Sequence, residues 1–96
     1  MGEFLVYILY SEKEDFYYIG QTENVNIRVQ EHLHGKYDRA FTKRADDWTV
    51  IQTISCHSKQ QAICIEQHIK RMKSRVYIEN LQRYPEMVEK LIKRYS

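Results

Sequence analysis

Five side chains in this 96-residue sequence are of types that bind anions, hold metal ions or transfer protons. They are Tyr7, Tyr18, Arg28, His32 and Glu66. A guanidinium binds anionic oxygens, a carboxylate holds hard cations, and phenol and imidazole groups take part in proton transfer. Taken one at a time, each has an ordinary structural explanation, because aromatic residues are frequent in strands and Glu66 has Lys70 four residues later as a helical partner. The elements that position these side chains decide between the two interpretations.

Two apolar segments predict the centre of a sheet. In Phe4–Tyr10 both alternating faces are apolar, as in a strand covered on both sides, so this segment is predicted to be the central strand. Residues 11–15 are polar and Phe16–Gln21 is aromatic and β-branched, which predicts a β-hairpin with a loop of about five residues. Gly20 ends the second strand, where it permits a backbone conformation or a close approach that a side chain would block.

A first helix is predicted after the hairpin. Thr22 or Asn24 is a good N-cap, apolar residues recur every four positions, and Gly35 is a C-terminal stop. Arg28 and His32 form a second stripe on this helix and point to the same side. The helix therefore presents a guanidinium and an imidazole next to each other.

The second half of the sequence predicts one more strand and three more helices, after a charged loop. An edge strand is indicated by four apolar side chains that alternate with more polar ones, Trp48, Val50, Ile54 and Cys56. Ser58–Gln61 is a capping-box pattern that begins a helix, and Glu66 falls at the border of the apolar stripe of this helix. Because an unpaired carboxylate there would be costly, Glu66 is expected to have a cation or hydrogen-bond donors. Ser74 and Pro85 are predicted to begin two short helices.

The predicted fold is a single α/β domain over residues 1–96, with a small three-stranded antiparallel sheet flanked by helices. A chain with 43% apolar and 29% charged residues has the composition of a globular protein with one core. No apolar run approaches the ~20 residues of a membrane helix, and no signal segment precedes the first strand. A cytoplasmic protein without membrane contact is therefore expected.

Cysteine spacing predicts reduced thiols. Cys56 and Cys64 have no C-x-x-C spacing and no export signal beside them, so a disulfide is not expected. A zinc site formed by both thiols with His57 and His68 is an alternative, and the irregular spacing makes it the weaker one.

The charges are unevenly distributed along the chain. The net charge of +2 is too small to indicate nucleic-acid binding by itself. However, residues 36–44 carry four Lys or Arg against one Asp, and residues 59–75 carry five against one Glu. Such runs fit a polyanionic partner, and they equally fit a solvated helix face.

In chain order, Tyr7, Tyr18-Ile19-Gly20, Arg28-x-x-x-His32, Glu66 and Lys73-Ser74-Arg75 resemble the GIY-YIG nuclease superfamily. The sequence looks closest to the small stand-alone bacterial members that are similar to the nuclease domain of excinuclease C. The resemblance covers a core at about residues 4–81 and leaves a C-terminal helical extension at 82–96. The first motif reads Leu5-Val6-Tyr7 instead of Gly-Ile-Tyr, and its tyrosine is kept.

The resemblance implies an endonuclease that hydrolyses phosphodiester bonds in DNA with a divalent metal ion. Glu66 would hold Mg²⁺, or Mn²⁺ as a substitute, and Arg28 would bind the non-bridging phosphate oxygens. Tyr7 would take a proton from the attacking water, and Tyr18 would orient that water or the phosphate. A free tyrosine has a pKa near 10, so a phenolate at pH 7 costs about 4 kcal/mol. Either Arg28 and the metal lower that cost, or Tyr7 passes its proton on, with His32 as one acceptor.

Contacts with the DNA backbone are expected from the basic segments, namely from Lys36, Arg39, Lys43, Arg44, Lys70, Arg71, Lys73 and Arg75. Such contacts give salt-dependent affinity without sequence specificity. The main alternative function is a nucleic-acid-binding module on the same scaffold with negligible catalysis. A structural or protein-interaction domain is a third, and the oligomeric state is left open.

Overall fold

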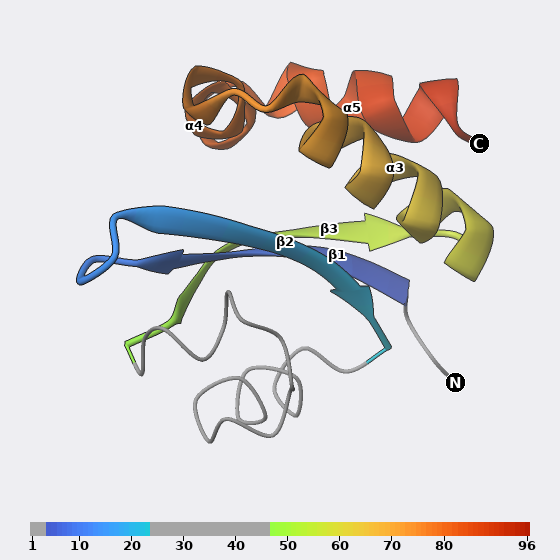
Figure 1. Ribbon diagram of the computed structural model, residues 1–96. Coiled ribbons are helices and arrows are strands. Elements are labelled where there is room, and N and C mark those ends of the chain that lie inside the picture. Colours follow the sequence, from blue (N-terminus) through green and yellow to red (C-terminus); the bar gives the residue numbers. More distant parts are fainter. Residues whose placement is uncertain (1–3, 24–46) are drawn as a thin grey trace.

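The computed structural model describes residues 4–23 and 47–96, and Figure 1 shows their arrangement. The described elements, in chain order, are β1 (Phe4–Ser11), β2 (Phe16–Thr22), β3 (Thr49–Cys56), α3 (Lys59–Met72), α4 (Arg75–Arg83) and α5 (Pro85–Arg94). The helix predicted after the hairpin and most of the charged loop lie outside the described residues. Among the described helices, none combines the length and the apolarity that crossing a bilayer requires.

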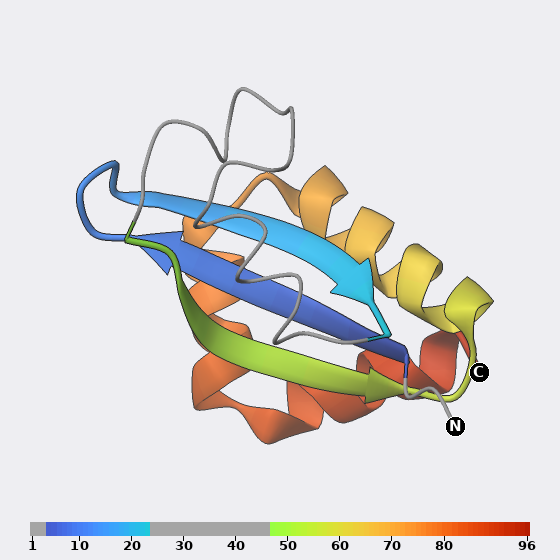
Figure 2. The same ribbon diagram turned by 90° about the horizontal axis from the view of Figure 1, so that it is seen from below.

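The three strands form one antiparallel sheet with the order β2-β1-β3. The predicted central position of β1 and the predicted edge position of β3 are both confirmed, and Figure 2 shows β1 between its two neighbours. A turn at residues 12–15 closes the hairpin, and Asp15 adopts a left-handed conformation there with φ of 50°. Asp is one of the few residues with a side chain that visits this region readily.

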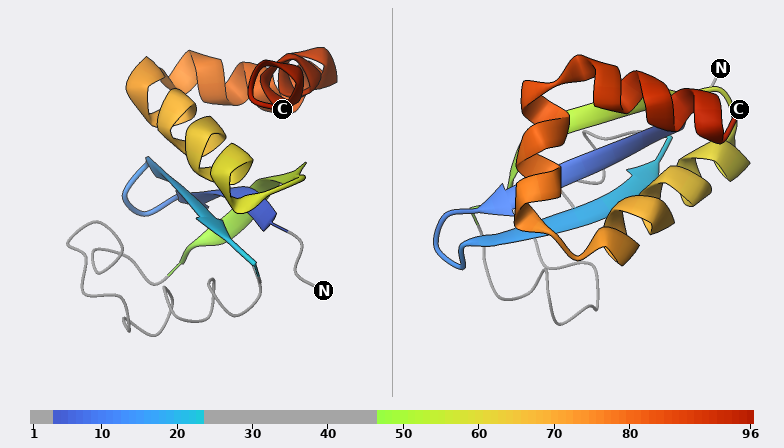
Figure 3. Two further views of the ribbon diagram at one scale, coloured as in Figure 1. Left: turned by 90° about the vertical axis from the view of Figure 1, so that its right-hand side faces the viewer. Right: turned by 90° about the horizontal axis from the view of Figure 1, so that it is seen from above.

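All three described helices cover the same face of the sheet (Figures 1 and 3). The core between the sheet and the helices contains Val6, Ile8, Ile19, Ile54, Ala62, Ile65, Ile69, Ile78, Leu81 and Leu91. A second buried cluster belongs to the opposite face of the sheet and contains Tyr7, Leu9, Tyr18 and Trp48. The prediction that both faces of β1 are covered is confirmed, because alternate β1 residues are buried in each cluster.

The faces of β3 differ from the prediction. A β-bulge lies opposite the Ile8–Leu9 step of β1, since Ile8 pairs with Gln52 and Leu9 with Val50. The extra β3 residue reverses the alternation of side chains, so that Trp48 joins the aromatic cluster while Ile54 packs under the helices. The predicted apolar face is therefore wrong, because it placed four residues together, Trp48, Val50, Ile54 and Cys56.

The predicted starts of the three helices are confirmed. The Ser58 hydroxyl accepts a hydrogen bond from the Gln61 N–H at 3.1 Å, and the Ser74 hydroxyl accepts one from the Tyr77 N–H at 3.1 Å. These bonds satisfy N–H groups that have no partner within the helix. Pro85 occupies the first turn of α5, where its fixed φ suits the helix.

The Gln61 side chain ties the start of α3 to its surroundings. In a capping box the third helical residue bonds back to the N–H of the N-cap residue, but here the Gln61 Oε1 accepts from the His57 N–H at 2.6 Å. The Gln61 Nε2 donates to the Ile92 carbonyl of α5 at 3.0 Å. With 2% of its surface exposed, Gln61 is a buried polar residue whose amide bridges two backbone groups.

Gln61→Ala is expected to lower the free energy of unfolding by about 1–3 kcal/mol, because it leaves buried donors and acceptors without partners. Chemical denaturation followed by circular dichroism measures this loss. The control is Gln60→Ala, which changes the exposed neighbouring residue of the same type. Equal stability of the two variants would show that the bridge contributes nothing.

Candidate active site

The Tyr7 phenol packs directly on the backbone of Gly20. The two residues are opposite each other in the β1–β2 register. A Cβ atom built on Gly20 would lie only 2.5 Å from the Tyr7 Cζ and 3.0 Å from its Cε1, which is closer than carbon atoms can pack. Of the two explanations predicted for Gly20, the close approach is confirmed, because any side chain would displace the phenol. The predicted strand end at Gly20 is wrong, because β2 continues to Thr22.

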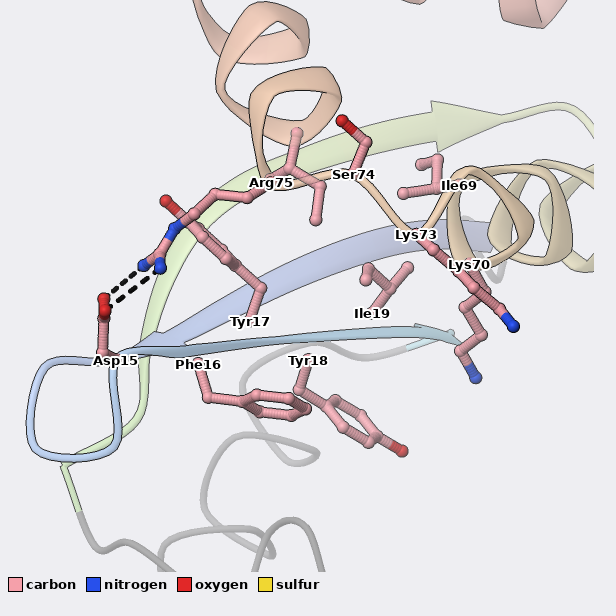
Figure 4. Close-up of a pocket in the computed structure, with 11 residues that line it drawn as sticks. Asp15, Phe16, Tyr17, Tyr18, Ile19, Ile69, Lys70, Lys73, Ser74 and Arg75 are labelled. Carbon is pink, nitrogen blue, oxygen red and sulfur yellow. Dashed lines mark hydrogen bonds and ion pairs between the residues drawn. The ribbon is translucent and has the colours of Figure 1, made fainter.

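Tyr7 and Tyr18 belong to one buried aromatic group. Their ring centroids are 6.4 Å apart, and the Tyr18 ring meets Trp48 edge-on at 6.4 Å. Only 2% of Tyr7 and 9% of Tyr18 is exposed. Packed aromatic rings at these spacings hold one another in place, so the two predicted catalytic tyrosines have fixed orientations. Figure 4 shows the Tyr18 ring on the side of β2 that faces away from α3 and α4.

Glu66 reaches the same region from α3. Its carboxylate accepts a hydrogen bond from the Lys70 Nζ at 2.7 Å, and 17% of the Glu66 side chain is exposed. The cation expected for Glu66 is therefore present. The Lys70 Nζ also lies 5.9 Å from the centroid of the Tyr18 ring, within the range of a cation–π interaction. Lys70 thus connects the carboxylate on α3 with the aromatic group on the sheet.

The predicted DNA-contacting residues of the described part have different environments. Lys70 pairs with Glu66, whereas Arg71 and Lys73 are exposed at the end of α3. Lys73 caps α3 in a left-handed conformation with φ of 47°. Six other predicted site residues lie outside the described residues, namely Arg28, His32, Lys36, Arg39, Lys43 and Arg44.

Arg75 is engaged in a contact that the sequence did not predict. Both of its terminal nitrogens donate to the Asp15 carboxylate in the hairpin turn, and its guanidinium lies 5.3 Å from the centroid of the Tyr17 ring. The hydrogen bonds from Arg75, and then from Tyr10, hold the pKa of the Asp15 carboxyl below its ordinary value. Arg75 therefore joins the turn to α4. No periodic signal connects residues that are sixty positions apart.

The described residues contain no group of three or more His, Cys, Asp or Glu side chains that could hold a metal ion. The four residues of the zinc alternative are all described; among them, His68 is hydrogen-bonded to the Tyr95 hydroxyl at 2.9 Å. Mg²⁺ has a different requirement, because it is often bound by one or two carboxylates together with waters and phosphate oxygens. Glu66, a partly exposed carboxylate paired with the ammonium of an exposed lysine, fits this mode of binding.

A family model described as the GIY-YIG catalytic domain matches residues 3–81. The chain belongs to the GIY-YIG family. This family consists of nucleases that act on DNA and generally depend on a divalent metal ion. The matched region includes Tyr7, Tyr18, Gly20 and Glu66, and it excludes α5. Comparisons with curated proteins and with solved structures give no match, so the narrower similarity to excinuclease C stays a prediction.

The structure brings three of the five predicted catalytic side chains of the GIY-YIG site into one region. Tyr7 comes from β1, Tyr18 from β2 and Glu66 from α3. Sequence reasoning paired Lys70 with Glu66 but missed its contact with Tyr18, because helical spacing reports neighbours on one helix and not on the strand beside it.

Gly20→Ala is expected to destabilise the protein by about 1–3 kcal/mol, because the added methyl group overlaps the Tyr7 ring. In a Tyr7→Leu background the same change should cost much less, which gives a coupling energy of about 0.5–3 kcal/mol in a double-mutant cycle. Denaturant unfolding of the four proteins measures it.

The control cycle replaces Tyr7→Leu by Tyr84→Leu, at an exposed tyrosine between α4 and α5. If Gly20→Ala costs the same in all three backgrounds, the close approach of Tyr7 and Gly20 does not constrain the site.

Proposed function

We propose that this GIY-YIG protein is a metal-dependent endonuclease that hydrolyses DNA phosphodiester bonds at Tyr7, Tyr18 and Glu66. The observation that carries the proposal is the connection of these side chains from three elements, through a 6.4 Å ring contact and through Lys70. Family membership supports the reaction class. A binding module without catalysis has no observation in its favour.

Glu66 would hold the divalent ion, with Mg²⁺ as the expected ion and Mn²⁺ as a substitute. One protein carboxylate leaves most of the coordination to waters and to the phosphate, which suits the reluctance of Mg²⁺ to lose its water. When bound, such an ion polarises a phosphate oxygen and stabilises the leaving oxygen.

The tyrosines would handle the attacking water. The Tyr7 ring packs against Gly20, and its hydroxyl would accept the proton of the water during attack. Either Arg28 and the metal ion would lower the pKa of the Tyr7 phenol, or its phenolic proton would pass on during the step, with His32 as one acceptor. Tyr18 would orient the water or the phosphate from the neighbouring strand. Arg28 is predicted to bind the non-bridging oxygens, where charge develops in the transition state.

Lys70 would have two partners in turn. It is ion-paired with Glu66 in the structure. With Glu66 holding a divalent ion, the Lys70 ammonium would be available to a phosphate oxygen together with Lys73 and Arg71. Contacts of this kind hold the DNA backbone irrespective of sequence.

The test is cleavage of supercoiled and branched DNA by wild type, Tyr7→Phe and Glu66→Gln in Mg²⁺, Mn²⁺ or chelator. Tyr7→Phe keeps the buried ring and removes only the hydroxyl, and Glu66→Gln keeps the size of the side chain. We expect metal-dependent cleavage by the wild type and a loss of about 100-fold or more in each variant.

Two variants serve as matched controls for the cleavage test. Tyr10→Phe removes a hydroxyl from the same strand, one that donates to Asp15, and Glu79→Gln removes an exposed carboxylate of α4. Both should cleave like the wild type. Equal cleavage by wild type and Glu66→Gln would place the activity elsewhere or in a contaminant. DNA binding in chelator without cleavage in either metal would favour the binding module.

Lys70→Met is expected to tighten Mn²⁺ binding about two- to fivefold, because it removes an ammonium that competes for Glu66 through a partly exposed ion pair. A Mn²⁺ titration followed by electron paramagnetic resonance, without DNA, measures the affinity. Lys59→Met, at the exposed start of α3, is the control. Unchanged or weaker binding by Lys70→Met would contradict the competition between lysine and metal.

A further inference from the structure

A pocket of 520 Å³ opens at the outer edge of β2, beside the junction of α3 and α4 (Figure 4). Its volume is within the range of about 300–1,000 Å³ that is usual for ligand sites. The residues that carry the argument are Tyr17, Tyr18, Ile19, Lys70, Lys73 and Ile78. We call this site the β2-edge pocket.

We propose that the β2-edge pocket receives the base of an unpaired nucleotide adjacent to the phosphodiester at the active site. This inference rests on the proposed nuclease function and names its substrate class, which is DNA with unpaired nucleotides at the point of cleavage.

The walls of the pocket are complementary to the apolar faces and to the polar edge of a nucleobase. Ile19, Ile69 and Ile78 line it and are almost fully buried in the core, so this lining is apolar and held in place. The faces of a base are also apolar. β2 is an edge strand, so its outer side carries backbone N–H and C=O groups that β1 does not use. Such groups can bond to the polar edge of a base, as they do for other extended ligands.

The charges at the mouth of the pocket favour a phosphate-bearing ligand. Lys70 and Lys73 both line the pocket, and Figure 4 shows their side chains extending from the end of α3 toward β2. The single carboxylate among the described lining residues is Asp15, which is paired with Arg75. Within the described part of the chain, Lys73 has no ion pair. The mouth is therefore positive and complementary to a DNA backbone.

The pocket shares two residues with the candidate active site. Tyr18 and Lys70 line the pocket, and the Lys70 ammonium both pairs with Glu66 and lies 5.9 Å from the centroid of the Tyr18 ring. A phosphodiester held at Glu66 would therefore bring an adjacent nucleotide to the pocket. A base inside a duplex must first leave its stack, which costs free energy, whereas an unpaired base enters without that cost. An extended peptide could add to the β2 edge, but the lysines and the shared Tyr18 favour nucleic acid.

The test uses the full chain carrying Glu66→Gln in chelator, so that no strand is cut. Fluorescence anisotropy measures the affinity for three DNAs. The first is a duplex with a short single-stranded gap, and the second is the fully paired duplex of the same sequence. The third has the same gap, but its unpaired nucleotides are abasic. We expect the gapped DNA to bind about tenfold more tightly than either of the other two at equal salt. Equal affinities for all three would overturn the proposal.

Two protein variants show whether the preference comes from the pocket. Ile78→Phe fills part of the pocket and should abolish the preference for the gapped DNA, whereas Ile92→Phe, on α5, should keep it; thermal unfolding verifies that both are folded. Asparagine suits the left-handed backbone at position 73. Lys73→Asn should therefore weaken the binding of all three DNAs about equally, and it should lower the slope of log affinity against log salt by about one. A gap preference that survives Ile78→Phe would overturn the assignment.

The outcomes separate this inference from the proposed function. Metal-dependent cleavage by the wild type without a gap preference would overturn the pocket assignment alone. A gap preference lost in Ile78→Phe, with no cleavage by the wild type, would uphold base binding and overturn the nuclease proposal. An extended apolar peptide could instead protect the backbone amides around Ile78 from hydrogen exchange, while Ile78→Phe leaves the DNA affinities unchanged. That result would assign the pocket to a protein ligand.

Discussion

The contact between the Tyr7 phenol and the Gly20 backbone is the constraint on which the candidate site depends. It requires that β1 and β2 pair in one register, because a slip by one residue would turn Tyr7 toward the helices and Val6 toward the site. The same register places Ile8 opposite Ile19 beneath the helical layer. Core packing and the geometry of the candidate site therefore select the same strand pairing.

Helix α3 also contributes both to the core and to the candidate site. Ile65 and Ile69 are almost fully buried against the sheet, and Glu66 lies next to Ile65 on the chain. The position of the carboxylate is thus fixed by the burial of its neighbour. Gln61 and the Ser58 cap hold the beginning of the same helix. A rigid helix on a packed core positions a functional group better than a loop does, which suits the metal-binding role proposed for Glu66.

The cations near the site have separate roles that a charge count does not distinguish. Arg75 is held by Asp15 and stacks on Tyr17, which fixes the hairpin turn to α4. Lys70 is held by Glu66, the proposed metal ligand. Lys73 extends into the mouth of the β2-edge pocket. Three residues from one basic segment therefore serve the fold, the proposed metal site and the proposed ligand pocket.

The sequence by itself determined the described strands, the caps at Ser58 and Ser74, the helix start at Pro85 and the motif of the family. These features depend on side-chain alternation and on hydrogen bonds between near neighbours, and both involve residues that are close together in the sequence. For Gly20 the sequence indicated either a special backbone conformation or a close approach, and the pairing of β1 with β2 decided for the close approach.

Only the tertiary structure decided the bulge in β3, the bridge from Gln61 to α5, the Arg75–Asp15 contact and the meeting of Lys70 with Tyr18. Each of these depends on elements that are distant in sequence, and their positions follow from the packing of the whole core. The single extra residue in β3 is an example: it leaves the local pattern unchanged, yet it moves Trp48 to the face opposite Ile54.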